Sequence, residues 1–213
     1  FTELEFSNIR TPEVIVPQWV RGEASFDVLA PFPQRMVTLA LGGSVGTPDE
    51  GLIAPIVMVR DVPALQALPE GAVRGKIVFF NRAMPRSFLR TFQAYGDAVP
   101  QRSNGAIEAG KAGAIAAIVR SMTTSIDGYP HTGAMRYDDG VEKVPACAIA
   151  TEDAEALARM LATAPVRVRL QLGCRTEPDV MSHNVIAEIR GSERPDEVVV
   201  LGGHLDAWDL GEG

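Results

Sequence analysis

The amino-acid sequence predicts a mixed fold, of the α+β or α/β class, from three observations. Short apolar runs typical of strands alternate with short helical patterns through the middle of the chain. Hydrophobic residues make up 46% of the chain and charged residues 22%, which are globular averages and exclude a disordered tail or a coiled coil. The 213 residues amount to about 1.4 domains of average size, so we expect more than one domain but less than two.

The first part of the chain is typical of strands joined by turns. Residues 14–20 and 24–29 are rich in strand-forming side chains, and the turn at Gly22 between them predicts a β-hairpin. A third strand is predicted over residues 36–41. It ends in the glycine-rich loop 42–48, which is the first candidate domain boundary.

From residue 51 onward the pattern predicts one compact α+β unit of about 130 residues. Continuous apolar runs are typical of buried strands, and amphipathic runs are typical of helices. In chain order we expect a strand over 53–59, a helix over 62–68, a strand over 75–80, a helix over 103–111, strands over 114–119 and 144–149, a helix from Thr151 and a strand over 166–170.

The helix that begins at Thr151 has the clearest helical pattern. Thr151 is the expected N-cap, and the carboxylates of the first turn suit the positive end of the helix dipole. The apolar residues at spacings of three and four predict one buried stripe, made of Ala154, Leu157, Ala158 and Leu161.

A second candidate boundary lies at residues 176–179. Two more strands are predicted after it, over residues 184–189 and 198–201, joined by a turn at 191–196. Because residues 198–201 are apolar without interruption, we expect this strand to be covered on both faces.

The charge balance and the apolar runs exclude several classes of protein. The chain has 20 Lys and Arg against 27 Asp and Glu, a net charge of −7, and no basic stripe, so no nucleic-acid partner is expected. Apolar runs such as 112–119 are too short to span a bilayer. Cys147 and Cys174 are too few for a disulfide scaffold, which leaves one bridge or two buried free thiols open.

The sharpest chemical signal is His204 followed by Asp206, at the carboxyl end of the predicted strand 198–201. Ligands bind beyond such strand ends in open α/β sheets. Neutral imidazole is a good zinc ligand, and a neighbouring carboxylate can accept its other ring N–H. A histidine and an aspartate at this spacing are also typical of an ordinary strand end, so the pair alone is a weak signal. His131 and His183 have no partner at ligand spacing, which favours structural or exposed roles.

Several segments together resemble the co-catalytic zinc exopeptidases, which include bacterial aminopeptidases and glutamate carboxypeptidases. VVVLGGHLDAWD (198–209) resembles the first metal motif of this family, and SHNVIAEIRG (182–191) resembles its plasma glutamate carboxypeptidase, or carboxypeptidase Q, branch. RGKIV (74–78) and AGKAGA (109–114) resemble the protease-associated domain that is inserted into such enzymes. Two shorter segments match the same branch: PHTG (130–133) and VPQWVRG (16–22).

The resemblance implies a compact protease-associated domain inserted between strands of an incomplete α/β zinc-peptidase domain. Residues 48–178 would form the protease-associated domain. Residues 1–47 would be the N-terminal part of the peptidase domain, and residues 179–213 its first core strands.

The resemblance also implies a site with two zinc ions, which would polarise the peptide carbonyl and activate a bridging water. His204 would bind one ion, and Asp206 would be the catalytic residue that supports it. The other ligands and the general base follow downstream in the family, beyond Gly213. We therefore expect a truncated fragment that binds zinc weakly and is inactive by itself.

The expected parent protein is a secreted or periplasmic metalloexopeptidase, a hydrolase that acts on small peptides. His131 would lie near the substrate, and a homodimer stays open. An alternative from another class is a non-catalytic protease-associated module that binds peptides or protein partners. A family member with altered chemistry, such as aminoacyl cyclisation, is a third reading of the same motif.

Overall fold

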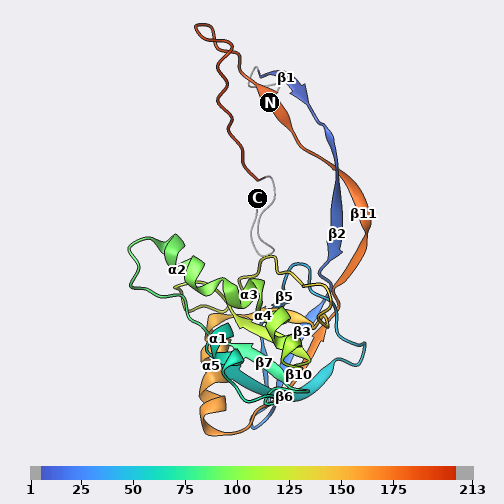
Figure 1. The fold of residues 1–213 in the computed structure, drawn as a ribbon, viewed down its shortest axis with the longest axis vertical. Helices are drawn as coiled ribbons and strands as arrows, with labels where there is room; N and C mark the ends of the chain where they lie inside the picture. The colour runs from blue at the N-terminus through green and yellow to red at the C-terminus, as the bar shows by residue number, and fades with distance from the viewer. Residues whose placement is uncertain (1–5, 205–213) are drawn as a thin grey trace. The chain divides into compact units, whose positions relative to one another are not determined.

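The structure, a computed structural model, describes residues 6–204 and divides into two compact units (Figure 1). The larger unit runs from Trp19 to Thr176. The smaller unit is made of the segments on either side, residues 1–18 and 177–213.

The larger unit mixes strands and helices, which confirms the predicted fold class. Its helices are α1 (Val62–Gln66), α2 (Thr91–Ala98), α3 (Pro100–Ser103), α4 (Gly105–Lys111) and α5 (Thr151–Thr163). Its strands are β3 (Ala24–Ala30), β4 (Gln34–Met36), β5 (Thr38–Ala40), β6 (Leu52–Val59), β7 (Ile77–Phe80), β8 (Ala116–Arg120), β9 (Ala146–Ile149) and β10 (Arg167–Leu172).

These eight strands form one sheet in the order β4-β3-β10-β6-β7-β8-β9-β5. Strands β6 to β9 run parallel, and the other pairs are antiparallel. The two strands at the ends of this order, β4 and β5, are separated in sequence only by Val37. The sheet therefore closes on itself, which removes most of the unpaired edges that would invite pairing with other chains.

Alternate residues of the parallel strands pack into two different cores. In β7, Ile77 and Phe79 face a core shared with β3, β10 and α5. Val78 and Phe80 face a second core covered by α1 and α4. Because both faces are covered, these strands are continuous apolar runs, as the sequence pattern predicts.

The predicted hairpin around Gly22 is wrong, although both of its strands form. Strand β3 pairs with β10 and β4, whereas β2 (Glu13–Val20) pairs with β11 (Arg175–His183). The reason is packing: Phe26 of β3 is fully buried against β10, while β2 continues into the smaller unit.

Two local expectations at helices also differ from the structure. The N-cap of α5 is Ala150, not Thr151, because the Thr151 hydroxyl accepts the Asp127 N–H at 2.8 Å and donates to its carbonyl. In the predicted apolar stripe of α5, Ala154 and Leu157 are fully buried and Leu161 packs partly buried against the same core, whereas Ala158 is only half-buried. Helix α2 has no counterpart among the predicted elements.

The larger unit begins at Trp19 rather than after residue 47, because β3, β4 and β5 belong to its closed sheet. Its end at Thr176 falls at the second predicted boundary. The identity of the two units as protease-associated and peptidase domains stays a prediction.

In the smaller unit, β1 (Ser7–Arg10) pairs antiparallel with β12 (Ile186–Glu188), within the predicted strand 184–189. The predicted strand 198–201 does not form: its four apolar side chains are between 81% and 91% exposed. A strand needs a neighbour to satisfy its backbone groups, and no neighbouring strand of the described residues pairs with this segment.

Two further findings concern membrane-spanning helices and the state of the two cysteines. In the part of the chain that the structure describes, no helix is both long and apolar enough to cross a membrane. Cys147 and Cys174 are both buried free thiols, not a bridge.

Candidate functional site

The predicted zinc ligand His204 is exposed, at the end of the irregular apolar stretch 198–201 in the smaller unit. The predicted catalytic residue Asp206 lies outside the described residues.

A metal site requires several converging donors, and three protein ligands are the usual minimum for a catalytic zinc. Within residues 6–204, no three His, Cys, Asp or Glu side chains come together in a way that could hold a metal ion. The described residues do not by themselves fit a zinc ion, so no chemical step through a metal is derived from them.

His131, predicted to lie near the substrate, has a hydrogen-bonded backbone and a half-exposed ring. It follows β8 in the larger unit, and its N–H donates to the buried Ser121 Oγ at 2.7 Å. Its Nε2 lies 3.7 Å from Asp127 Oδ1. The loop thus holds a half-exposed imidazole beside a carboxylate, in a different compact unit from His204.

The carboxyl edge of the parallel strands carries a group of charged side chains that is not among the predicted site residues. Arg82, just after β7, donates from Nη1 to Asp61 Oδ2 at 2.8 Å and from Nε to Asp97 Oδ2 at 2.9 Å. The hydrogen bond to Asp97 raises the pKa of Arg82. The Gln101 amide bonds the backbone N–H and C=O of Arg82 at 3.0 Å each, so this loop is firmly held.

A second arginine at the same edge, Arg120, is buried, with a side chain only 5% exposed. Its Nη1 donates to Glu155 Oε1 at 2.6 Å and to Asn81 Oδ1 at 3.2 Å. Because Arg82 and Arg120 both have carboxylate partners, these groups are an ion-pair network that ties loops to α5 and α2. The sequence carries a signal for them, since Asp61, Asn81 and Arg120 follow three predicted strands, which the structure shows to be parallel.

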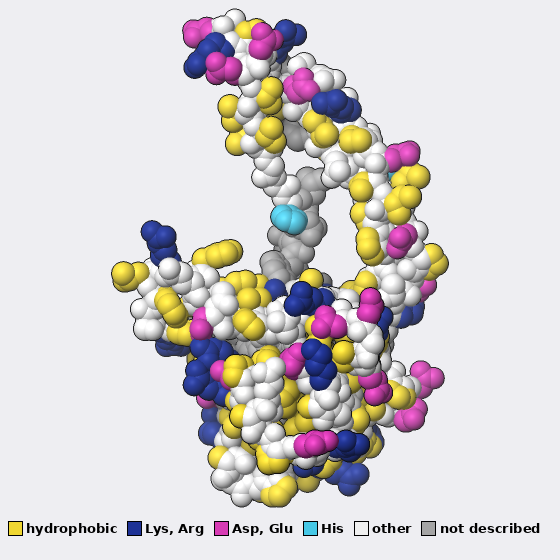
Figure 2. All heavy atoms as spheres, viewed as in Figure 1, with side chains coloured by type: hydrophobic (Ala, Val, Ile, Leu, Met, Phe, Trp, Pro, Cys, Tyr) yellow, Lys and Arg dark blue, Asp and Glu magenta, His cyan; other side chains and the backbone are white. Residues whose placement is uncertain are grey.

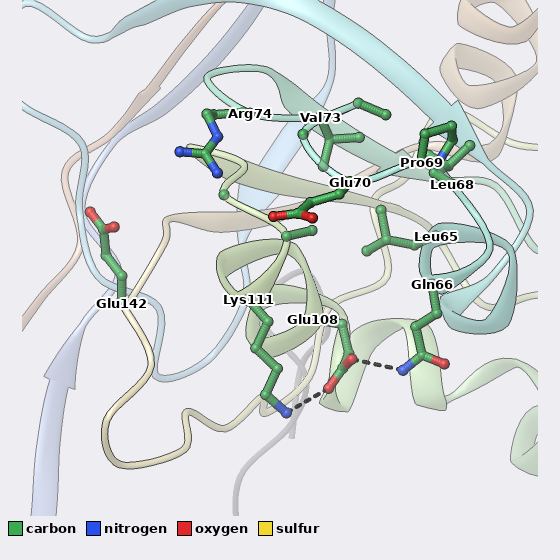
Figure 3. Close-up of a pocket in the computed structure, with 14 residues that line it drawn as sticks. Leu65, Gln66, Leu68, Pro69, Glu70, Val73, Arg74, Glu108, Lys111 and Glu142 are labelled. Atoms are coloured by element: carbon green, nitrogen blue, oxygen red, sulfur yellow. Dashed lines mark hydrogen bonds and ion pairs between the residues drawn. The ribbon is translucent and has the colours of Figure 1, made fainter.

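A depression of about 560 Å³ lies between α1, the turn 67–75 and α4 (Figure 3). The buried side chains of Leu65 and Val73 contribute to its lining, and charged side chains surround it. Glu108 accepts from Lys111 Nζ and from Gln66 Nε2, both at 2.8 Å (Figure 3). The hydrogen bond from Lys111 lowers the pKa of Glu108, which keeps this carboxylate ionised and paired.

No family model matches the chain, but curated relatives match nearly all of it. Carboxypeptidase Q of Mus musculus is 40% identical over 207 residues, which is 97% of this chain and 42% of that protein. Carboxypeptidase Q of Homo sapiens is 41% identical over 201 residues, 94% of this chain and 41% of that protein. The chain thus spans less than half the length of these relatives.

Solved structures give the same relationship. The peptidase M28 precursor of Shewanella amazonensis is 41% identical, with a TM-score of 0.92 over 99% of this chain and 47% of that one. An aminopeptidase from Aneurinibacillus has a TM-score of 0.58 at 16% identity, over 92% of this chain, a likeness of fold alone. In sequence and in fold, this chain is similar over nearly its whole length to carboxypeptidase Q and to an M28 peptidase.

Proposed function

We propose that this chain is part of a co-catalytic zinc exopeptidase, an aminopeptidase or carboxypeptidase that hydrolyses small peptides with a metal-activated water. One observation carries the proposal: about two residues in five are identical to carboxypeptidase Q over 97% of the chain. The segment VVVLGGHLDAWD (198–209), which resembles the family's first metal motif, supports it. Because the chain spans less than half of those relatives, we propose that activity resides in a longer polypeptide and that this chain alone is inactive.

The residue roles follow the family motif. We propose His204 as a ligand of one of two zinc ions and Asp206 as the residue that supports that ligand. His131 is proposed to lie near the substrate, since its loop holds the imidazole exposed beside Asp127. The larger unit is proposed to be the protease-associated domain, because its closed sheet and two cores make it self-contained.

We further propose a secreted or periplasmic location and peptides as substrates. The location is supported by the Shewanella relative, which is described as a precursor. Self-association to a homodimer is proposed as a property of the longer polypeptide.

The test compares the 213-residue chain with a polypeptide extended to the length of the carboxypeptidase Q relatives. Both are incubated with a panel of dipeptides, with zinc or with a chelator. We expect hydrolysis by the extended protein only, and its loss in chelator. Chelator-sensitive hydrolysis by the 213-residue chain would contradict the proposed inactivity.

Variants of the extended protein test the residue roles. His204→Ala should lower kcat by about 100-fold or more, in the range expected for loss of part of a metal site. His183→Ala is the matched control, because His183 is also an exposed histidine of the smaller unit, and it should leave kcat unchanged. Full activity of His204→Ala would refute the metal role. For His131→Ala we expect a raised KM, and unchanged kcat and KM would refute its place near the substrate.

The second candidate is a binding module without peptidase activity. The observation that favours it is the self-contained larger unit, which has its own closed sheet and cores. Peptide binding by the extended protein without hydrolysis, in the presence of zinc, would decide for this reading.

A further inference from the structure

The segment around the start of α2 exposes several large apolar side chains of the larger unit. Residues 86–93 are all exposed, and among them Leu89 is fully exposed and Phe92 is 84% exposed. Figure 2 shows hydrophobic side chains gathered on the lobe that carries α2, next to a Lys or Arg side chain. A cluster of large apolar side chains in water is typical of an interaction site.

The lobe is not a loosely attached loop. The buried side chains of Ala94 and Ala98 from α2 pack with Met84 and Met122 in a small core of their own. Arg86 Nη2 donates to the Thr124 carbonyl at 2.6 Å, which ties the segment to the loop after β8. The exposed side chains are therefore displayed from an anchored backbone.

A pocket of about 400 Å³ opens in this lobe. This volume falls within the range of about 300–1,000 Å³ typical of ligand sites. Its walls combine one guanidinium with apolar and hydroxyl groups: Pro85, Arg86, Phe88, Thr91, Ala94 and Thr124.

The charge of the pocket is positive, although the chain as a whole carries −7. Within the described residues, no carboxylate pairs with Arg86, which donates instead to the neutral carbonyl of Thr124. The carboxylate of α2, Asp97, is already bound by Arg82. A guanidinium has five N–H donors in a planar fork, so Arg86 retains donors for an incoming carboxylate after bonding Thr124.

We propose that this pocket binds an acidic-aromatic peptide segment of a protein partner. The carboxylate of an Asp or Glu side chain pairs with Arg86, and a flanking large apolar side chain packs on Phe88. A guanidinium held beside an aromatic wall favours this combined chemistry. The site lies wholly within the larger unit and uses neither zinc nor a free peptide terminus, so it is separate from the proposed exopeptidase activity.

The experiment titrates the ¹⁵N-labelled 213-residue chain with the capped peptide Ac-Ser-Phe-Glu-Phe-Ser-NH2, in the presence of a chelator. Because both ends are blocked and metal is removed, exopeptidase chemistry cannot contribute. We expect saturable amide shifts at residues 86–94 and at Thr124, with a Kd of about 0.1–1 mM for a contact of this size. The same peptide with Gln in place of Glu should bind about tenfold more weakly.

Two variants with matched controls test the named contacts. Arg86→Gln should weaken binding by about tenfold or more, and Phe88→Ala by about fivefold or more. Arg74→Gln removes the same charge from an exposed arginine of the other depression. Phe32→Ala removes another exposed phenylalanine, so both controls should bind like the unchanged chain. Thermal unfolding of each variant verifies that the fold is retained.

Three results would overturn the proposal. They are equal binding of the Glu and Gln peptides, shifts confined to other residues, and unchanged binding by Arg86→Gln. Binding to vesicles rich in phosphatidylglycerol, without binding to the peptide, would instead assign the lobe to a membrane surface. None of these results bears on the zinc exopeptidase proposal, because metal and His204 take no part in the measurement.

Discussion

Replacing Gly22 with alanine tests the closest backbone approach at the beginning of the larger unit. Gly22 has φ +66°, and a Cβ built on it would lie 2.4 Å from the carbonyl oxygen of Gly173 and 2.7 Å from its carbonyl carbon. The Gly173 N–H donates to the Glu23 carbonyl at 2.8 Å. A side chain at position 22 would therefore force apart two backbone segments that are hydrogen-bonded to each other.

Gly75 supplies the matched control. It has φ +68°, and apart from Gly75 itself and its two chain neighbours no heavy atom of the described residues lies within 4 Å of the Cβ that alanine would add. Gly75→Ala should cost about 1 kcal/mol, the usual penalty of an L-residue in the left-handed region. Gly22→Ala meets the same penalty and adds about 1–3 kcal/mol for overpacking against backbone, about 2–4 kcal/mol in total.

The measurement is the free energy of unfolding in urea, followed by far-ultraviolet circular dichroism. The difference between the two variants isolates the clash, because the backbone penalty is common to both. Equal free energies of unfolding for Gly22→Ala and Gly75→Ala would refute the reasoning, since the close approach at Gly173 would then cost nothing.

Three further predictions concern the core and its titratable groups. Leu157→Ala should lower the free energy of unfolding by about 2–5 kcal/mol, because Leu157 is fully buried. Leu161→Ala should lower it clearly less, because the Leu161 side chain is only partly buried. Equal losses for the two variants in urea titrations would contradict this. Burial raises the pKa of Cys147 to about 12 and also raises that of Cys174. A thiol-specific disulfide reagent should therefore label neither cysteine until guanidinium unfolds the chain. Prompt labelling of the folded protein would contradict this prediction. Burial raises the pKa of Asp153, so its carboxyl favours folding most at low pH and loses that contribution as pH rises through the raised pKa. The free energies of unfolding of the unchanged chain and of Asp153→Asn are measured in urea from pH 4 to pH 7, and the variant should become more stable relative to the unchanged chain as pH rises. A difference that does not change with pH would contradict this.

Most strands of the larger unit could be predicted because their apolar runs are local patterns. Residues 77–80 and 114–119 are continuous apolar runs, and they form β7 and β8, which are covered on both faces. The alternation at 166–170 became β10, whose side chains alternate between exposed and buried. The sequence pattern does not predict helix α2, because its large apolar side chain Phe92 is exposed while small alanines form its buried face.

The candidate site could be predicted only as a motif. His204 and Asp206 stand two residues apart, and that spacing carries the family resemblance, but metal binding depends on donors brought together from distant parts of a chain. Within the described residues no such group forms. The pocket at Arg86 has the opposite character: no motif marks it, and it exists because Arg86 bonds the carbonyl of Thr124, 38 residues away.

The sequence by itself determined the mixed α/β class, the positions of most strands and the resemblance to carboxypeptidase Q, because side-chain periodicity and short motifs are local properties of the chain. Only the tertiary structure decided which strands pair. Residues 14–20 and 24–29 are neighbours in sequence, yet β2 pairs with β11 and β3 pairs with β10. Pairing depends on which buried faces meet across the closed sheet, and burying Phe26 against β10 outweighs the short turn at Gly22 that a hairpin would have used.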